Sequence, residues 1–562
     1  RAPSTDGFSG ANTAPVTATR PPAEAGEYGF DFLSRGHDRP DDRMKSKDKK
    51  PAKELYRQLR ALTCDQLWSV EVPRFDRASP QERIERVSVI RAVSVVFSES
   101  GTVQQKAAAR PWLRGLLQDP SEKVRRYAMA AMPKLGVGPG EEAELLALLR
   151  TTTVEREKKS LGEALEKVGG AATLQEMGRA PEGFLRQTEQ KVKARIARSQ
   201  TPSTVRLDRP LTNFSGLRIH LRGRRGLEPM VLAEVEEYVR AHGQFRINGV
   251  RSGLVALTPV APFSIGDIYS LRCFGEVGFV LGMVNPAEEE DPVGALASTI
   301  TSPLSQRLLR AFTDGPIRYR LDFASHGHQR GAVRLVTNRA YEFCPDILND
   351  PRSAPWTVSV VPGERGDSVE LVPNLTPDPR LYFRLEDVPA ASHPPLAASM
   401  ARLAGPMNDE VVWDPFCGSG LELIERALLG GVRRVIGTDL SAEAIGISQR
   451  NFAAAELKDV TAQFACADFR DFAGVSGLGP GTASLVITNP PMGRRVQLDD
   501  LHGLIADLVS VAAQVLRPGG RLVFANPVRL EGLPRTLRRE SSQVVDMNGF
   551  DCRLELYRKV AG

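Results

Sequence analysis

The sequence predicts a multidomain protein with an α-helical N-terminal region, an α+β middle region and an α/β C-terminal domain. Apolar residues recur at helical spacing from about 51 to 200. Strand-like and helix-like segments then alternate from 206 to 384, and a strand, a glycine turn and a helix follow at 411–425. A chain of 562 residues is too long for one hydrophobic core, so three or four domains are expected.

The composition is that of an ordinary globular protein, with 41% hydrophobic and 25% charged residues. No apolar run approaches the roughly 18 residues of a membrane span. The net charge of +6 is compatible with nucleic acid as a partner. The six cysteines are scattered without a C-x-x-C pair, so we expect neither disulfides nor zinc, and a cytoplasmic setting. His326 and His328 lack an evident third ligand, so no metal site is predicted.

Residues 1–50 are rich in Pro, Ala, Gly and Ser, then in Lys, and show no hydrophobic period. We predict that this segment is disordered. The chain begins at Arg1 rather than methionine, and Met44 is a candidate start. The alternative is that residues 1–43 are the remnant of an organelle-targeting segment, against which their acidic residues argue.

Two helix–turn–helix units, 116–136 and 148–169, end about 33 residues apart in the region 51–200. Neither unit buries its apolar face alone, so we predict stacked helices. The first unit resembles a HEAT repeat, with Asp119-Pro120 in its turn. Such a region is either a docking surface for RNA or a protein, or an extension that packs on the rest of the chain. Residues 171–205 are polar and basic, and we expect a linker there.

The middle region starts with a strand at 217–221, where apolar and polar residues alternate, followed by a basic turn. Arg222, Arg224 and Arg225 of this turn are candidate contacts to RNA phosphates, because guanidinium groups match phosphate oxygens in geometry. The alternative is scattered surface charge. A strand pair is predicted at 356–361 and 369–372, because Pro-Gly and Gly-Asp mark a turn between them.

The C-terminal domain, 386–562, opens with a strand that ends at Asp414 and a turn that contains Gly418 and Gly420. Glycine allows a tight turn, and the start of the next helix directs free N–H groups at a ligand. In an open α/β sheet this arrangement holds a nucleoside-like cofactor. Asp439 ends the second strand, 25 residues after Asp414, where its carboxylate would bind both ribose hydroxyls.

An apolar run at 484–487 leads into Asn489-Pro490-Pro491-Met492. The exocyclic amine of a nucleobase is a poor nucleophile, because its lone pair is delocalised into the ring. The Asn489 side-chain oxygen and the Pro490 carbonyl would accept its two N–H bonds and aim the lone pair at a methyl donor. The alternative is an ordinary Asn-Pro turn after a strand.

Together the two motifs resemble motifs I and IV of S-adenosylmethionine-dependent amino-group methyltransferases. Residues 210–562 resemble a THUMP-domain RNA methyltransferase of the guanine-N2, UPF0020-like type, including Asp378–Arg384 as the linker into the enzyme. The resemblance implies a ferredoxin-like/THUMP RNA-binding region at 206–384 and a Rossmann-like, seven-stranded methyltransferase domain at 386–562. The cofactor it implies is S-adenosyl-L-methionine, held by Asp414, Phe416, Gly418, Gly420, Asp439 and Asp468.

In this resemblance Asp468 meets the adenine amino group, with Asp471 as a competitor. Arg494 and Arg495, which follow the Asn-Pro-Pro motif, are candidate contacts to RNA phosphates beside a flipped base, and the alternative is surface charge. Met492 departs from the family pattern, in which an aromatic residue stacks on the target base. A methionine sulfur can still contact a ring.

The product that the resemblance implies is N2-methylguanosine in tRNA or rRNA. One alternative is an N6-adenine methyltransferase acting on RNA or DNA, because the same Asn-Pro-Pro geometry serves either amine. The other is a non-catalytic RNA-binding or assembly factor with a lapsed enzyme domain, which Met492 favours. The expected partners are RNA and, through the HEAT-like helices, a protein.

Overall fold

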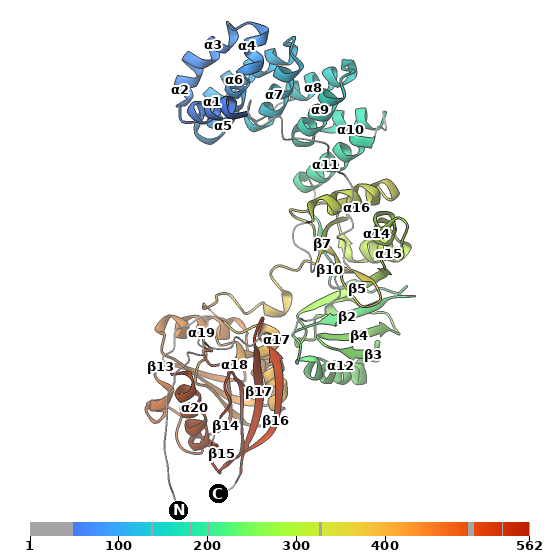
Figure 1. Cartoon of the computed structure of the whole chain (residues 1–562). Coiled ribbons are helices and arrows are strands. Elements are labelled where there is room, and N and C mark those ends of the chain that lie inside the picture. Colours follow the sequence, from blue (N-terminus) through green and yellow to red (C-terminus); the bar gives the residue numbers. More distant parts are fainter. Residues whose placement is uncertain are drawn as a thin grey trace, which may run out of the picture.

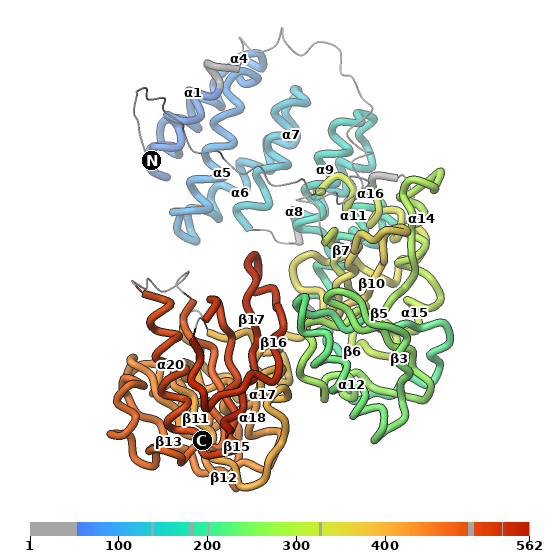
Figure 2. Tube along the Cα trace, turned by 60° about the horizontal axis from the view of Figure 1, so that its bottom comes forward, coloured from blue at the N-terminus to red at the C-terminus, as the bar shows by residue number. Residues whose placement is uncertain are grey.

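The computed structural model describes residues 49–136, 139–179, 183–200, 202–324, 329–389, 391–492, 500–530 and 532–560. A helical region, a region built on one large sheet and a C-terminal α/β domain follow one another along the chain (Figure 1). The C-terminal domain, in orange and red, lies beside the green middle region, with β16 and α17 on the side that faces it (Figure 2).

The helical region packs short helices around one apolar core. Its helices are α1 Lys49–Arg60, α2 Cys64–Gln66, α3 Val72–Asp76, α4 Pro80–Glu85, α5 Ser88–Ser100, α6 Val103–Gly115, α7 Glu122–Ala131, α8 Pro139–Thr151, α9 Glu155–Val168, α10 Ala171–Met177 and α11 Gly183–Gln200. Helix α5 lies at the centre, because its apolar residues, including Ile90, Val93 and Phe97, are buried against its neighbours. The likeness of these helices to HEAT repeats stays a prediction.

The prediction of a linker at 171–205 is wrong, because α10 and α11 occupy most of this segment. The polar composition hides an apolar stripe: Val192 and Ala194 of α11 are buried. Ala194 packs with Tyr341 and Leu348 of the middle region. Arg198 forms an ion pair with the buried Asp350 at 3.0 Å. Helix α11 therefore joins the helical region to the middle region through a packed contact.

The middle region is an eight-stranded mixed sheet in the order β3-β4-β2-β5-β10-β9-β7-β8, with β1 and β6 paired separately. The strands are β1 Thr204–Val205, β2 Arg218–Arg222, β3 Phe245–Arg251, β4 Leu254–Pro259, β5 Glu276–Val284, β6 Thr313–Asp314, β7 Arg318–Phe323, β8 Leu348–Asn349, β9 Trp356–Val361 and β10 Asp367–Pro373. The helices are α12 Glu228–His242, α13 Ile265–Ile268, α14 Pro292–Ile300, α15 Pro303–Phe312 and α16 Arg330–Phe343. The predicted strand pair corresponds to β9 and β10, which are antiparallel. The THUMP assignment stays a prediction.

The C-terminal domain has a seven-stranded sheet in the order β13-β12-β11-β14-β15-β17-β16. The strands are β11 Glu410–Asp414, β12 Val432–Asp439, β13 Thr461–Cys466, β14 Ala483–Thr488, β15 Leu516–Asn526, β16 Leu537–Asp546 and β17 Asp551–Lys559. The helices are α17 Pro394–Ala404, α18 Leu421–Leu428, α19 Ala442–Ala454 and α20 Leu501–Val515. The first five strands of this order are parallel, and β17 runs antiparallel to both its neighbours.

Helices cover both faces of this sheet. Helices α17, α18 and α19 pack on one face, and α20 with the 3-10 turn Phe469–Gly474 packs on the other. The chain order reverses between β11 and β14, which are neighbours, so the ends of β11, β12 and β14 meet at one edge. In open α/β sheets this switch point is where ligands bind.

The middle region and the C-terminal domain share a packed, charged contact. Leu227, just after the basic turn, is buried in the apolar cluster of α17 and β16. Arg272 pairs with the buried Glu425 of α18 at 2.6 Å. The Asp546 N–H donates to the Arg225 carbonyl at 2.9 Å. These contacts bring the basic turn to the tip of the β16–β17 hairpin.

Candidate functional site

A cavity of about 810 Å³ opens where β11, β12 and β14 end. Its walls come from the glycine turn after β11, the Asp439–Ser441 turn after β12, and Asn489–Met492 after β14. The segment before α17, the β16–β17 hairpin tip and Arg224 of the middle region complete the lining. A volume of this size accommodates a drug-sized or cofactor-sized ligand. The two motifs singled out in the sequence therefore share one cavity.

The glycine turn is fixed to the second strand by a hydrogen bond. Gly418 and Gly420 have φ of +52° and +82°, in the left-handed region that favours glycine. The Gly418 N–H donates to Asp439 Oδ2 at 3.0 Å, and the Ser441 N–H donates to Asp439 Oδ1 at 2.9 Å. The half-buried Asp439 carboxylate thus orders both turns and still lines the cavity.

Two carboxyl groups, Asp414 and Glu422, are buried behind the turn. Burial raises the pKa of Asp414 well above its usual range, and the negative charge of Glu422 adds to this rise. Burial also raises the pKa of Glu422, while a hydrogen bond from the Ser392 hydroxyl opposes the rise. Burial is the first cause of both shifts, so this part of the site disfavours two negative charges side by side.

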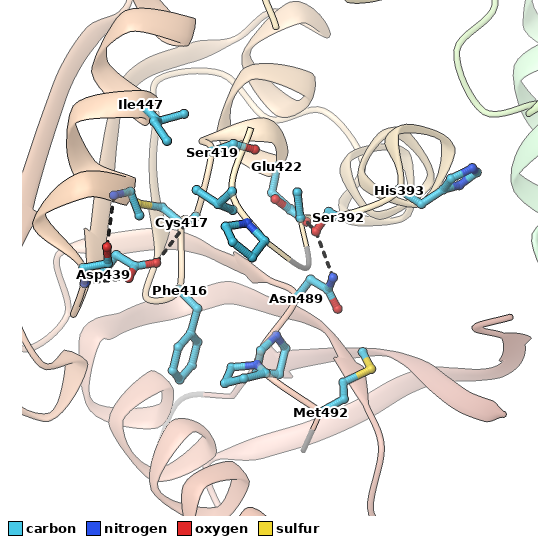
Figure 3. A pocket seen from close by; sticks show the side chains of 18 of the residues that line it. Ser392, His393, Phe416, Cys417, Ser419, Glu422, Asp439, Ile447, Asn489 and Met492 are labelled. Atoms are coloured by element: carbon cyan, nitrogen blue, oxygen red, sulfur yellow. Dashed lines mark hydrogen bonds between the residues drawn. The ribbon is translucent and has the colours of Figure 1, made fainter. Parts of the chain in front are cut away.

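Asn489 faces the cavity in one defined orientation (Figure 3). Its Nδ2 donates to Ser392 Oγ at 2.8 Å. Its Oδ1 is buried and has no hydrogen-bond partner among the described residues. A buried carbonyl oxygen without a partner costs about 1–3 kcal/mol, so an incoming N–H donor would be favoured there.

Another part of the cavity wall combines apolar side chains with a histidine and an arginine. Met492, Met547 and the half-buried Phe550 line it together with His393 and Arg224. The Arg224 guanidinium donates to the Met547 sulfur at 3.5 Å. Burial, and the nearby positive charges of Arg224 and two other arginines, lower the pKa of His393 to about 4. The His393 imidazole is therefore neutral at physiological pH.

Several predicted cofactor residues lie beside the cavity rather than in its wall. Asp414 is fully buried at the end of β11, where its Oδ1 accepts the Phe416 N–H at 3.0 Å. Phe416 lines the cavity, and Gly420 is the N-cap of α18. Asp468 pairs with Arg470 at 3.1 Å and is not among the lining residues.

The predicted RNA-binding arginines separate in space. The Arg222 Nε donates to the buried Glu370 within the middle sheet at 2.9 Å, away from the cavity. Arg225 pairs with Asp551 of the hairpin at 2.9 Å. Only Arg224 of the three lines the cavity in the described structure. Arg494 and Arg495, like His326 and His328, lie outside the described residues.

Ser392, Glu422, Met547 and Phe550 were not singled out as site residues from the sequence. The cavity unites them from three segments, and in sequence each has an ordinary local setting. Within the described ranges there is no cluster of three or more His, Cys, Asp or Glu side chains arranged to hold a metal ion. No helix in the described part of the chain has the length and apolarity needed to cross a bilayer.

Comparison with known proteins adds a family for one part of the chain. Residues 382–550 match the family described as "UPF0020: RMKL-like, methyltransferase domain". The chain is 28% identical over 162 residues to a tRNA (guanine(10)-N2)-dimethyltransferase of Methanocaldococcus jannaschii, covering 28% of this chain and 42% of that protein. It is 32% identical over 104 residues to the rRNA N(6)-adenosine-methyltransferase metl-5 of Caenorhabditis elegans, covering 18% and 45%. The chain thus spans less than half the length of each.

Among solved structures, TrmN from Thermus thermophilus is similar with a TM-score of 0.50 and 21% identity. The similarity covers 61% of this chain and 100% of that one. It extends beyond the C-terminal domain and supports the fold. Residues 382–550 thus match a methyltransferase-domain family in sequence, and the fold of the chain resembles that of TrmN.

Proposed function

We propose that the C-terminal domain transfers a methyl group from S-adenosylmethionine to an exocyclic amine of a nucleobase in RNA. The target that we propose first is N2 of guanine. The observation that carries this proposal is the shared cavity. Asn489, with its unpartnered side-chain oxygen, and Asp439, with the glycine turn it orders, line the same 810 Å³ space.

The cofactor half of the cavity fits a nucleoside with an amino-acid tail. The Asp439 carboxylate can accept hydrogen bonds from ligand hydroxyls. The backbone at Gly418 leaves room for a ligand to approach, since a Cβ there would come no nearer than 3.5 Å to Val388. Phe416 presents an aromatic wall backed by Phe469, with ring centroids 4.9 Å apart. S-adenosylmethionine, when bound, supplies a sulfonium methyl whose carbon–sulfur bond breaks as the amine nitrogen takes the methyl group.

Asn489 and Pro490 supply the acceptors on the substrate side. Asn489 Oδ1 and the Pro490 carbonyl each take one N–H of the target amine, which directs its lone pair along the line of transfer. Positive charge develops on the nitrogen, and the two oxygens stabilise it. The proton released from the nitrogen passes to solvent, so no strong general base is required.

Met492 and Phe550 form the nucleobase wall in this proposal. The position after Asn489-Pro490-Pro491 carries a thioether, which contacts a ring through a polarisable sulfur. Phe550, from the hairpin tip 58 positions further along the chain, lines the same cavity. An aromatic ring stacks on a base for about 1–3 kcal/mol. Phe550 would thus supply the aromatic contact that residue 492 does not.

The choice of RNA and of guanine rests on relatives. One curated relative is named a guanine-N2 methyltransferase of tRNA, and it matches the longer segment, 162 residues. The other is named an N6-adenosine methyltransferase of rRNA and is slightly more identical, 32% over 104 residues. That second match favours adenine N6 as the second candidate, and the Asn489 geometry serves both amines.

The remaining regions are proposed to deliver the RNA. We assign RNA binding to the THUMP-like region 206–384, supported by Arg224 at the cavity rim. The HEAT-like helices of 51–200 are proposed as a docking surface for RNA or a protein. Arg225, although paired with Asp551, is exposed and remains within reach of a phosphate.

One experiment separates these candidates. The full chain is incubated with isotope-labelled S-adenosylmethionine and unmodified tRNA or rRNA, and the digested nucleosides are identified by mass spectrometry. Labelled N2-methylguanosine is expected. Labelled N6-methyladenosine would replace guanine by adenine as the target, and cofactor binding without transfer to either RNA would favour the non-catalytic alternative.

A further inference from the structure

Ser392 connects two groups that are far apart in sequence. It lies just before α17, between Glu422 on α18 and Asn489 after β14 (Figure 3). Ser392 Oγ accepts the Asn489 Nδ2–H at 2.8 Å and also contacts Glu422 Oε1. All three side chains line the cavity.

The number of protons decides the direction of these two hydrogen bonds. A serine hydroxyl carries one proton, and an ionised carboxylate only accepts. In the structure the Ser392 hydroxyl donates its one proton to Glu422, so the Ser392 oxygen accepts from Asn489. An asparagine side chain can satisfy that demand only with its NH₂ end. Its oxygen then points the other way, where it has no partner among the described residues.

We propose that Ser392 and Glu422 are positioning residues that lock the Asn489 amide with its oxygen toward the target amine. This inference rests on the proposed function. The two ends of an amide are nearly equal in shape, and its terminal torsion is broadly two-fold, so packing alone discriminates poorly between them. The reversed amide would present N–H donors to the N–H donors of the substrate.

Burial raises the pKa of Glu422, and several features of its surroundings oppose that rise, including the hydrogen bond from Ser392. Glu422 lies in the first turn of α18, where the helix dipole stabilises negative charge. Arg384 also lowers the pKa of Glu422, while Glu425 raises it.

The test compares Ser392→Ala with Ser392→Thr in the full chain. We expect Ser392→Ala to lower kcat for methyl transfer roughly tenfold or more, because it removes the acceptor that holds the Asn489 amide in one direction. KM for RNA and the affinity for S-adenosylhomocysteine, measured by calorimetry, should stay within about twofold, because an amide oriented wrongly leaves both subsites intact. Ser392→Thr keeps the hydroxyl and should restore kcat.

Glu422→Gln is the second variant, and it preserves side-chain volume if Ser392→Ala does not fold. Glutamine can donate to Ser392, which frees the Ser392 proton to face Asn489 and removes the fixed direction. A lower kcat in this variant supports the inference, and an unchanged kcat overturns it.

Asn489→Ala, measured in parallel, distinguishes a failure of the positioning role of Ser392 from a failure of the proposed function. If Asn489→Ala is inactive while Ser392→Ala keeps wild-type kcat, the positioning role is wrong and the proposed function stands. If Asn489→Ala keeps wild-type turnover, the proposed function itself fails. A loss in Ser392→Ala that appears only as weaker cofactor binding would show that Ser392 shapes the cavity and does not orient Asn489.

Discussion

The Asp439 carboxylate accepts a hydrogen bond from the backbone N–H of Gly418 at 3.0 Å. This contact joins the end of the second strand to the glycine turn after the first. One carboxylate oxygen orders the turn, and the other accepts the N–H of Ser441. Each oxygen has further lone pairs for a ligand in the cavity.

Asp439→Ala is expected to weaken binding of S-adenosylhomocysteine by about 10- to 100-fold, because it removes acceptors for the ribose hydroxyls and loosens the turn. Calorimetry on the purified full chain measures this directly. Asp459→Ala is the matched control, since Asp459 is exposed outside the cavity. Equal affinity of Asp439→Ala and wild type would remove Asp439 from the cofactor site.

Phe550→Ala is expected to weaken RNA binding or raise KM for RNA about tenfold, through loss of stacking on the target base. Affinity for S-adenosylhomocysteine should not change, because Phe550 lies on the hairpin side of the cavity. Phe550→Tyr keeps the ring and should behave as wild type. Phe343→Ala, an exposed phenylalanine of α16, controls for loss of a surface aromatic. A normal KM in Phe550→Ala would assign the nucleobase wall to other residues.

The sequence predicted that the glycine turn and the Asn489 segment lie together because its signals are local, while the roles of these residues stay a prediction. The strand, glycine turn and helix around Gly418, and the Asn489 segment after a buried strand, each fit within ten or so residues. Parallel strands that follow such a pattern end at one sheet edge, so the shared cavity follows from the topology. The Ser392–Asn489 hydrogen bond spans 97 residues, and no local pattern reveals such a contact.

Composition misled the prediction for 171–205. Lysine and arginine dominate the surface of α11, while its buried positions include the polar Thr188 and Gln190 beside the apolar Leu185, Val192 and Ala194. A helix of this kind is stabilised by tertiary packing more than by its own apolar content. The arginines of the basic turn were likewise equivalent in sequence, and only the fold gives Arg222 and Arg225 carboxylate partners.

Glu410→Ala is expected to destabilise the C-terminal domain by about 3–5 kcal/mol, because it leaves two buried arginines without their carboxylate partner. Glu410 is fully buried and pairs with Arg426 and Arg521, whose pKa values burial lowers to about 10. Urea unfolding monitored by tryptophan fluorescence, with the buried Trp413 as a reporter, measures the loss. Glu540→Ala removes the more exposed partner of Arg558 and should cost no more than about 1 kcal/mol. Equal midpoints for the two variants would contradict this account.

His393 should make stability depend on pH. Its folded-state pKa of about 4 lies below the ordinary value of 6.5, so the unfolded chain binds the proton more tightly. The stability contributed by neutral His393 is present above about pH 6.5 and is lost as pH falls toward 4, by up to about 1.4 kcal/mol per pH unit. Urea unfolding at pH 7 and pH 5 should show a smaller pH difference for His393→Asn than for wild type. Identical differences would mean that His393 titrates normally.

The central claim is that the Asn489 side chain holds the target amine for methyl transfer. The most direct measurement compares wild type and Asn489→Ala with labelled S-adenosylmethionine and unmodified RNA, identifies the nucleosides by mass spectrometry, and determines affinity for S-adenosylhomocysteine. We predict labelled N2-methylguanosine with wild type, a loss of at least about 100-fold in kcat with the variant, and equal cofactor affinity. Turnover in Asn489→Ala equal to that of wild type would contradict the claim.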